Sequence, residues 1–288
     1  MLDSRIFSLN CAGGGSRFPI QLGYLKAIKD RGLEPDMVFG ASVGALLACF
    51  FIQGHLAQAE DLVYNIENED VYRTNWLNLP RILWDKNSIY DSSPLKELLD
   101  RYVDHEKLVK SKIDFYISVT NLIGSSTEIY SPKDVDEATF KKLLLASASP
   151  PLAFPPVEVW PGKFYGDGGL LSNFNLHLAV KKGAQDIILV SPTTKEKSSI
   201  KNAGKMFEIL TSVPEYGYLE RELSFIEKIN QVEANFPDLR KIRCLVIKPE
   251  QPTGIGLLDF TFARKDRVNL INDAYVYAKG KIENFLLT

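Results

Sequence analysis

A serine flanked by small residues carries the clearest chemical signal in the sequence. It lies in the run Gly40-Ala41-Ser42-Val43-Gly44, which has the G-x-S-x-G spacing of a nucleophile elbow. An elbow of this kind joins a strand to a helix, needs small flanking residues because its backbone is strained, and presents the serine hydroxyl at the start of the helix. Apolar residues at 37–39 and 45–51 supply that strand and that helix. The pattern therefore predicts that Ser42 is a nucleophile rather than part of a structural turn.

Three consecutive glycines form a second candidate, in the run Gly13-Gly14-Gly15-Ser16-Arg17. This run follows the first predicted strand and opens the first predicted helix. Attack of a serine on an ester creates an oxyanion, which needs preorganised N–H donors. Glycines expose their amides without steric hindrance, and a helix N-terminus favours an anion. We therefore expect the three glycines to form an oxyanion loop, with Arg17 as a candidate substrate contact at its end.

The same glycine run has two competing interpretations, both of which concern phosphate binding. A dinucleotide-binding fingerprint would need a glycine where Phe18 stands, and a Walker A loop would need Gly-Lys in place of Phe18-Pro19. Because the sequence meets neither requirement, phosphate binding by this loop is disfavoured.

A carboxylate bounded by glycines is the third candidate, in Gly166-Asp167-Gly168-Gly169 after a predicted strand. Taken alone, this run is also typical of an ordinary Asp-Gly turn. A serine nucleophile needs a base, however, and few histidines are available. The chain has three, of which only His177 follows Asp167 in the Ser…Asp…His order of α/β-hydrolases. Since His177 lies in a short apolar helical run, we interpret it as structural and predict a Ser-Asp dyad.

Four short blocks in order resemble the signature of the patatin-like phospholipase family. They are Gly13-Gly14-Gly15-Ser16-Arg17, Gly40-Ala41-Ser42-Val43-Gly44, the run from Ala146-Ser147-Ala148-Ser149-Pro150-Pro151 to Phe154-Pro155-Pro156-Val157, and Asp167-Gly168-Gly169. The resemblance extends from about Arg5 to Val190 and is weaker beyond Ser191. One departure is Phe18-Pro19, where the family usually has a glycine after the basic residue.

The resemblance implies a three-layer α/β/α fold with a mainly parallel central sheet. It further implies a dyad of Ser42 and Asp167, an oxyanion loop at residues 13–15, and hydrolysis of fatty-acyl esters of phospholipids or other lipids, with no metal and no cofactor. Three alternatives remain open. They are an acyltransferase, although that family has a histidine where Ala41 stands, a carboxylesterase that uses His177, and a non-catalytic lipid-binding protein of the same fold.

The elements that must position these residues alternate between strands and helices. Strand-like runs are predicted at 5–10, 36–39, 115–120, 163–166, 186–190 and 242–247. Helical runs are predicted at 20–28, 41–51, 56–72, 94–102 and 173–182, and as apolar stripes at 219–232 and 268–285. Such alternation favours a mainly parallel sheet covered on both faces. We expect a single domain over 1–288, with the catalytic blocks within 5–190 and a mainly helical completion of the fold over 191–288.

Composition narrows the range of partners. With 34 Lys and Arg against 36 Asp and Glu, the net charge of -2 offers no whole-molecule attraction for nucleic acid, and no nucleic-acid partner is expected. The longest apolar run, 41–52, is far shorter than the ~20 residues of a membrane span, so any contact with membranes is expected to be peripheral. The N-terminus has no basic n-region before a long apolar segment, which favours a cytoplasmic location.

Two further features lie outside the blocks. The cysteines Cys11, Cys49 and Cys244 are odd in number and far apart, so we expect them to be reduced and buried. The irregular run 73–93 carries several large apolar side chains, which are typical of ordinary core packing and also of a lid or a wall for an acyl chain.

Overall fold

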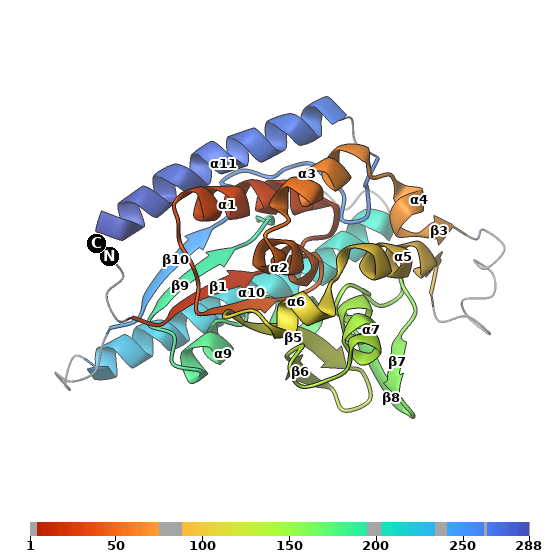
Figure 1. The fold of residues 1–288 in the computed structure, drawn as a ribbon, viewed down its shortest axis with the longest axis horizontal. Helices are drawn as coiled ribbons and strands as arrows, with labels where there is room; N and C mark the ends of the chain where they lie inside the picture. The colour runs from red at the N-terminus through yellow and green to blue at the C-terminus, as the bar shows by residue number, and fades with distance from the viewer. Residues whose placement is uncertain (1–4, 75–87, 195–202, 234–240, 262–263, 288) are drawn as a thin grey trace.

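A central sheet flanked by helices organises the molecule, as the computed structural model shows for residues 5–74, 88–194, 203–233, 241–261 and 264–287 (Figure 1). The strands are β1 (Phe7–Cys11), β2 (Met37–Gly40), β3 (Arg73–Thr74), β4 (Tyr90–Asp91), β5 (Asp114–Asn121), β6 (Ser126–Tyr130), β7 (Val157–Trp160), β8 (Lys163–Gly166), β9 (Asp186–Val190) and β10 (Arg243–Ile247). The helices are η1 (Gly15–Arg17), α1 (Phe18–Asp30), α2 (Val43–Gln53), α3 (Leu56–Asn65), α4 (Asn68–Val71), α5 (Ser93–Tyr102), α6 (His105–Val109), α7 (Glu137–Ser147), α8 (Gly169–Ser172), α9 (Leu176–Lys181), α10 (Ala203–Glu233) and α11 (Arg264–Leu287).

The main sheet is parallel in its larger part and antiparallel at one edge. Its order is β10-β9-β1-β2-β5-β8-β7, with β6 paired to β5 off this path. Strands β10, β9, β1, β2 and β5 are parallel to one another, whereas β6 and β8 run antiparallel to β5, and β7 antiparallel to β8. Strands β3 and β4 form a separate two-stranded sheet.

Alternating side chains give the parallel strands two buried faces. In β9, Ile188 and Val190 belong to one hydrophobic cluster, whereas Ile187 and Leu189 belong to the other. Successive side chains of a strand point to opposite faces, so a strand that is apolar at every position must be covered on both sides. The burial of all five residues of β9 fits this pattern.

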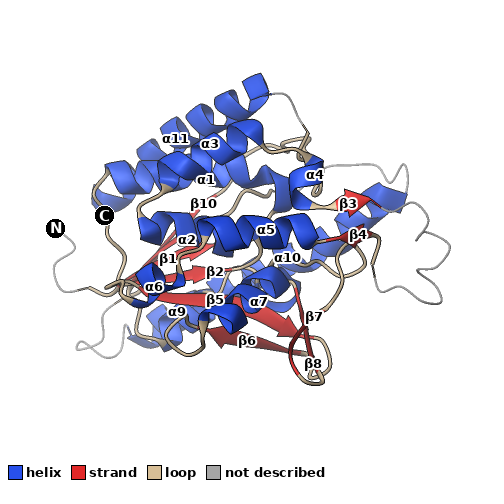
Figure 2. Cartoon of the chain, turned by 45° about the vertical axis from the view of Figure 1, so that its right-hand side comes forward, coloured by secondary structure: helices blue, strands red, loops and turns tan. Residues whose placement is uncertain are grey.

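Helices supply the two covers. Helices α1, α2 and α11 lie over one face of the sheet and α9 and α10 over the other (Figures 1 and 2). Helix α11 packs along α1, where Gly23 allows a close approach: a Cβ atom at this position would lie 2.4 Å from the carbonyl oxygen of Ile271. The predicted three-layer α/β/α class is therefore confirmed.

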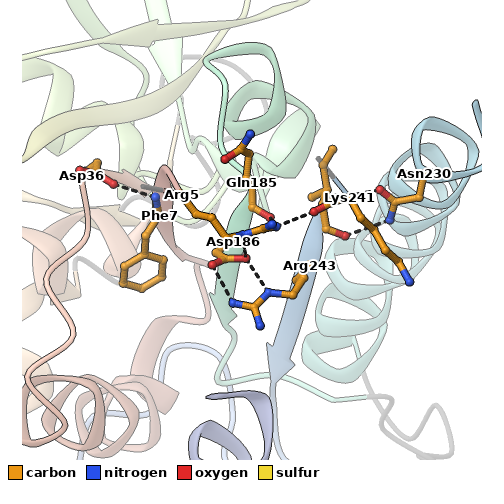
Figure 3. A network of polar contacts seen from close by, with 9 residues as sticks. Arg5, Phe7, Asp36, Gln185, Asp186, Asn230, Lys241 and Arg243 are labelled. Carbon is orange, nitrogen blue, oxygen red and sulfur yellow. Dashed lines mark hydrogen bonds and ion pairs between the residues drawn. The ribbon is translucent and has the colours of Figure 1, made fainter. Parts of the chain in front are cut away.

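An ionic network joins the amino-terminal ends of three strands (Figure 3). Asp186, the first residue of β9, accepts hydrogen bonds from Arg243 Nε and Nη2, both at 2.8 Å, and from Arg5 Nε at 2.9 Å. Arg5 also donates to the carbonyl oxygens of Gln185 and Lys241. Because the register pairs Phe7 with Asp186 in the parallel sheet, this network lies at the edge opposite to the carboxyl ends of the strands.

Several elements differ from the sequence-based expectation. The run 56–72 is two helices, α3 and α4, because the chain becomes extended at Ile66 and Glu67. The antiparallel strands β6 and β7 and the helices α6 and α7 were not predicted. The proposed lid or acyl-chain wall at 73–93 falls largely on residues 75–87, which lie outside the described part of the chain. Within that part, no helix is long and apolar enough to cross a membrane.

Candidate active site

The turn between β2 and α2 holds Ser42 in a conformation that few residues adopt. Ser42 has φ 53° and ψ −134°, directly before the first residue of α2, and its side chain is half-buried. A Cβ atom on Gly40 would lie 2.5 Å from the Cα atom of Ala45, and one on Gly44 would lie 2.3 Å from the carbonyl oxygen of Cys11. Both positions therefore require glycine. A strained residue that the surroundings hold in place is typical of an active site.

Ser42 is hydrogen-bonded to the predicted carboxylate. Its Oγ donates to Asp167 Oδ2 at 2.7 Å. Asp167 follows β8 and is 7% exposed, and its Oδ1 accepts from the N–H of Gly169 at 2.7 Å. The carbonyl oxygen of Asp167 accepts from Thr120 Oγ1 at 2.8 Å. The carboxylate is thus oriented from several sides while one oxygen contacts the serine hydroxyl.

The glycine loop lies against the serine. A Cβ atom on Gly13 would lie 2.7 Å from the Cβ atom of Ser42, so the loop and the elbow touch. The Gly13 N–H donates to Asn173 Oδ1 at 2.6 Å. Within the described part of the chain, the N–H groups of Gly14 and Gly15 have no hydrogen-bond partner. These two N–H groups are therefore the candidates for oxyanion donors.

The contact between loop and elbow leads to a prediction for Gly13→Ala. The new methyl group would lie 2.7 Å from Ser42 Cβ, closer than real Cβ atoms approach their neighbours, and 3.0 Å from Asn173 Oδ1. We expect the serine and the loop to shift apart and the rate of Ser42 modification by a fluorophosphonate to fall about a hundredfold. Gly280→Ala, in α11 with open space around it, is the matched control. An unchanged labelling rate in Gly13→Ala would contradict this contact.

The position of the glycine loop agrees with a general rule for open α/β sheets. Ligands bind outside the carboxyl ends of the strands, where the strand order reverses. From β1 the chain proceeds to β2 and β5 on one side, whereas β9 and β10 lie on the other. The loop follows β1, and a Cβ atom on Gly14 would lie 2.3 Å from Pro192 Cγ, just beyond β9. The candidate site is therefore at the switch point.

A distant segment, residues 255–258, covers the start of the first helix. The Ser16 N–H donates to the carbonyl oxygen of Leu257 at 2.9 Å, and Arg17 Nε donates to that of Ile255 at 2.9 Å. The Tyr72 hydroxyl donates to the carbonyl oxygen of Leu258 at 2.9 Å. Burial is the main reason why the pKa of Tyr72 is raised to about 12, so this hydroxyl stays protonated. Arg17 is itself buried, so its predicted contact with substrate stays a prediction.

The three histidines bond elsewhere. His177 Nδ1 lies 2.8 Å from Glu222 Oε1 of α10. His55 Nε2 lies 3.0 Å from Lys107 Nζ, and His105 Nε2 lies 3.0 Å from the carbonyl oxygen of Pro132. The imidazole that chain order would assign to a triad thus links α9 to α10, while Ser42 and Asp167 contact each other directly.

The serine-rich block between β6 and β7 reaches both halves of the site. Ser147 Oγ accepts from the Ser42 N–H at 3.0 Å and donates to the carbonyl oxygen of Ser118 at 2.8 Å. The carbonyl oxygen of Ser147 accepts from the Gly168 N–H at 3.1 Å, and that of Ser149 accepts from the Asp167 N–H at 2.9 Å. From the sequence this block was singled out for the family resemblance and its Phe154 part as a possible wall of an acyl channel, whereas Ser147 and Ser149 were assigned no role.

Two other contributors carry a weak signal or none in the sequence. Asn173 lies in the predicted helical run 173–182 and carries no signal of a site residue, yet its side chain anchors the glycine loop. Nothing in residues 255–258 distinguishes them from an ordinary loop, because they act through carbonyl oxygens.

Among the described residues no group of three or more His, Cys, Asp or Glu side chains is arranged to hold a metal ion. Cys11, Cys49 and Cys244 are free thiols, the first two of them buried.

Comparisons with known proteins agree with these blocks. Residues 9–180, more than half of the chain, match the family described as patatin-like phospholipase. Over 246 residues the chain is 22% identical to the neuropathy target esterase sws of Drosophila melanogaster, with 81% of this chain and 17% of that protein covered. Over 250 residues it is 23% identical to lysophospholipase NTE1 of Saccharomyces cerevisiae, with 81% and 14% covered. The chain spans less than a fifth of the length of these curated relatives.

Among solved structures, VipD from Legionella pneumophila has a similar chain. The TM-score is 0.48 with 12% sequence identity, over 97% of this chain and 66% of that chain.

Proposed function

This chain belongs to the patatin-like phospholipase family, and on that premise we propose that it hydrolyses fatty-acyl esters of lipids through Ser42 and Asp167. The observation that carries the proposal is the 2.7 Å hydrogen bond from Ser42 Oγ to Asp167 Oδ2, made directly and without an intervening imidazole. A base within 2.6–3.2 Å of the hydroxyl it deprotonates has the geometry that general-base catalysis requires.

The first half of the proposed reaction forms an acyl-enzyme. Ser42 Oγ attacks the ester carbonyl carbon while its proton passes to Asp167 Oδ2. The carbonyl oxygen becomes an oxyanion, which accepts hydrogen bonds from the N–H groups of Gly14 and Gly15. When the tetrahedral intermediate collapses, the C–O bond to the alcohol breaks, and the leaving oxygen takes the proton from Asp167. The acyl group is then esterified to Ser42.

The second half reverses these roles. Water attacks the acyl-enzyme carbonyl, and Asp167 accepts one of its protons. The oxyanion forms in the same loop, the bond to Ser42 Oγ breaks, and the serine recovers its proton from Asp167. The products are a free fatty acid and an unchanged enzyme. Each oxyanion donor is expected to contribute about 3 kcal/mol to lowering the barrier.

We further propose a long-chain acyl lipid as substrate, with lysophospholipid as the first candidate. The family assignment supports a lipid ester, and a lysophospholipase is among the relatives. Aromatic side chains also gather beside the segment that covers the glycine loop: Tyr72 donates to the carbonyl oxygen of Leu258, and Phe154 lies 6.2 Å from both Tyr72 and Tyr90, centroid to centroid. Any contact of the protein itself with a membrane surface would be peripheral.

A comparison of two ester classes tests this proposal. Fatty-acid release from micellar lysophospholipid or phospholipid should exceed hydrolysis of a water-soluble acetyl ester under matched conditions, and a fluorophosphonate should label Ser42. Equal or faster turnover of the acetyl ester would indicate a general esterase. Labelling that persists in Ser42→Ala would place the nucleophile elsewhere, and well-folded protein that is neither labelled nor active would favour a lipid-binding protein of the same fold.

A further inference from the structure

One buried serine, Ser147, is hydrogen-bonded through different atoms to Ser42 and to Gly168, the residue after Asp167. Its hydroxyl holds the main chain of Ser42, and its carbonyl oxygen holds the loop that begins at Asp167. Ser147 is the last residue of α7 and is fully buried. It touches neither the reacting oxygen atoms nor the candidate amide donors of the glycine loop.

The hydroxyl of Ser147 extends a chain of hydrogen bonds from the elbow into the sheet. The Ser42 N–H donates to Ser147 Oγ at 3.0 Å, and the Ser147 hydroxyl donates to the carbonyl oxygen of Ser118, within β5, at 2.8 Å. A residue at φ 53° and ψ −134° keeps its conformation only where the surroundings determine it. The bond from Ser147 restrains the peptide group on the amino side of Ser42, and so opposes relaxation of the elbow.

The carbonyl side of Ser147 restrains the base. The Gly168 N–H donates to the carbonyl oxygen of Ser147 at 3.1 Å. The same glycine is pressed against β5, since a Cβ atom on it would lie 2.1 Å from the carbonyl oxygen of Ser118. The loop of Asp167 and the elbow of Ser42 are therefore both fixed to the one pair of residues, Ser118 and Ser147.

This shared anchor has a consequence for the chemistry. Ser42 follows β2 and Asp167 follows β8, and these strands are separated by β5. In a dyad the proton moves directly from Ser42 Oγ to Asp167 Oδ2 along one hydrogen bond, here 2.7 Å long. Because no imidazole lies between the two residues, nothing can compensate for a change in the distance between these two oxygen atoms. A misplacement of about 1 Å by a mutation away from the reacting atoms can cost about a hundredfold in rate.

We infer that Ser147 is a positioning residue, which sets the distance between Ser42 Oγ and Asp167 Oδ2 by holding both main-chain segments. The inference rests on the proposed function, because it assigns Ser147 a part in the same reaction. A serine that only fills the core would affect stability alone. A positioning serine affects the rate of the chemical step and leaves substrate binding nearly unchanged.

The test compares Ser147→Ala with Ser149→Ala. Ser149 is a matched control for the hydroxyl, because it is buried in the same block and its hydroxyl donates to the carbonyl oxygen of Leu145 in α7 at 2.6 Å, away from both segments of the dyad. Its own bond to the Asp167 N–H is made by the main-chain carbonyl oxygen, which alanine keeps. For Ser147→Ala we expect kcat for lysophospholipid to fall about tenfold to a hundredfold with KM within about twofold. Fluorophosphonate labelling of Ser42 should slow by a similar factor. Ser149→Ala should stay within about threefold in both measurements.

A second measurement does not depend on activity. Removal of the Ser147 hydroxyl leaves the Ser42 N–H without its acceptor, so hydrogen exchange at the Ser42 amide should accelerate about tenfold or more in Ser147→Ala and not in Ser149→Ala. If Ser147→Ala fails to fold, Ser147→Cys takes its place, with intermediate changes expected because sulfur is a weak acceptor. Equal labelling rates and equal Ser42 exchange in the two alanine variants would overturn the inference. If the wild-type protein neither releases fatty acid nor is labelled, the proposed function is overturned instead. Faster hydrogen exchange at the Ser42 amide in Ser147→Ala than in Ser149→Ala would then still show that Ser147 holds the main chain of Ser42.

Discussion

Replacement of Asp167 by asparagine is expected to abolish acyl release as completely as replacement of Ser42 by alanine. An amide has the shape of the carboxylate but cannot accept the serine proton, so neither attack nor deacylation has a base. We expect each variant to lose about 10⁴-fold or more in kcat/KM, the scale found when serine hydrolases lose a catalytic member. Initial rates of fatty-acid release from lysophospholipid micelles measure the loss.

The double variant separates a shared step from two independent contributions. If Ser42 and Asp167 act in one proton transfer, Ser42→Ala combined with Asp167→Asn should be no slower than either single variant. Losses that multiply would show that Asp167 acts apart from Ser42. Because Asp167 also accepts from the Gly169 N–H, the unfolding transition of each variant should be compared with that of the wild type, so that a loss of fold is not mistaken for a loss of chemistry.

His177→Gln is the control that distinguishes a dyad from a triad. Glutamine can keep a hydrogen bond toward Glu222, which His177 contacts at 2.8 Å, and the pair lies between α9 and α10. We expect activity within about tenfold of the wild type, since only packing changes. A folded His177→Gln variant as inactive as Ser42→Ala would contradict the dyad and assign the chain to the Ser-Asp-His hydrolases, with Asp167 orienting the imidazole.

Much of the local architecture was predictable because it is encoded in consecutive residues. The elbow at 40–44 needs a small residue where β2 turns into α2 and another where α2 meets the end of β1, and the sequence provides Gly40 at the first contact and Gly44 at the second. Strand β9, apolar at four of its five positions, indicated burial on both faces. Short blocks in a fixed order also sufficed for the family resemblance, which the match over residues 9–180 confirms.

The rest depended on contacts between residues far apart in the chain. Alternation of strands and helices favours parallel pairing. Strand β8, which ends just before Asp167, instead runs antiparallel both to β5 and to β7. A serine in a proline-rich block does not show that its hydroxyl will reach Ser42, 105 residues away. Likewise, the segment over the glycine loop acts through the carbonyl oxygens of Ile255 and Leu257, which every residue type possesses.

Asp186→Asn is expected to lower the free energy of unfolding more than any change to a surface ion pair. The carboxylate is fully buried and accepts three hydrogen bonds from Arg5 and Arg243 at 2.8–2.9 Å, which tie β9 to β10 and to the segment before β1 (Figure 3). Asparagine offers one acceptor atom, and its amide group would face a guanidinium donor. Since two arginines would lose their counter-charge, we expect a loss of about 2–4 kcal/mol at pH 7.

The pH dependence of this loss follows from the pKa of Asp186. Burial alone would raise that pKa, but the hydrogen bonds and charges of Arg243 and Arg5 outweigh burial and hold it below its usual value. A carboxyl group whose pKa is lower in the folded state stabilises the fold above its unfolded pKa, about 3.9, and this contribution is lost as the pH falls through the folded pKa. The difference between wild type and Asp186→Asn should therefore be constant near neutral pH and shrink below about pH 4.

Denaturant unfolding at pH 7 and at pH 3.5 measures both parts of this prediction. Asp114→Asn is the matched control, because Asp114 pairs with Lys133 at 2.8 Å while half-exposed, and a surface pair of this kind contributes about 1 kcal/mol or less. Equal losses in the two variants at pH 7 would mean that the buried network adds nothing beyond a surface pair. A difference that grows on acidification would mean that the pKa of Asp186 is raised rather than lowered. Since the network joins the amino ends of strands whose carboxyl ends carry the glycine loop, folded Asp186→Asn protein should still be labelled at Ser42 at the wild-type rate.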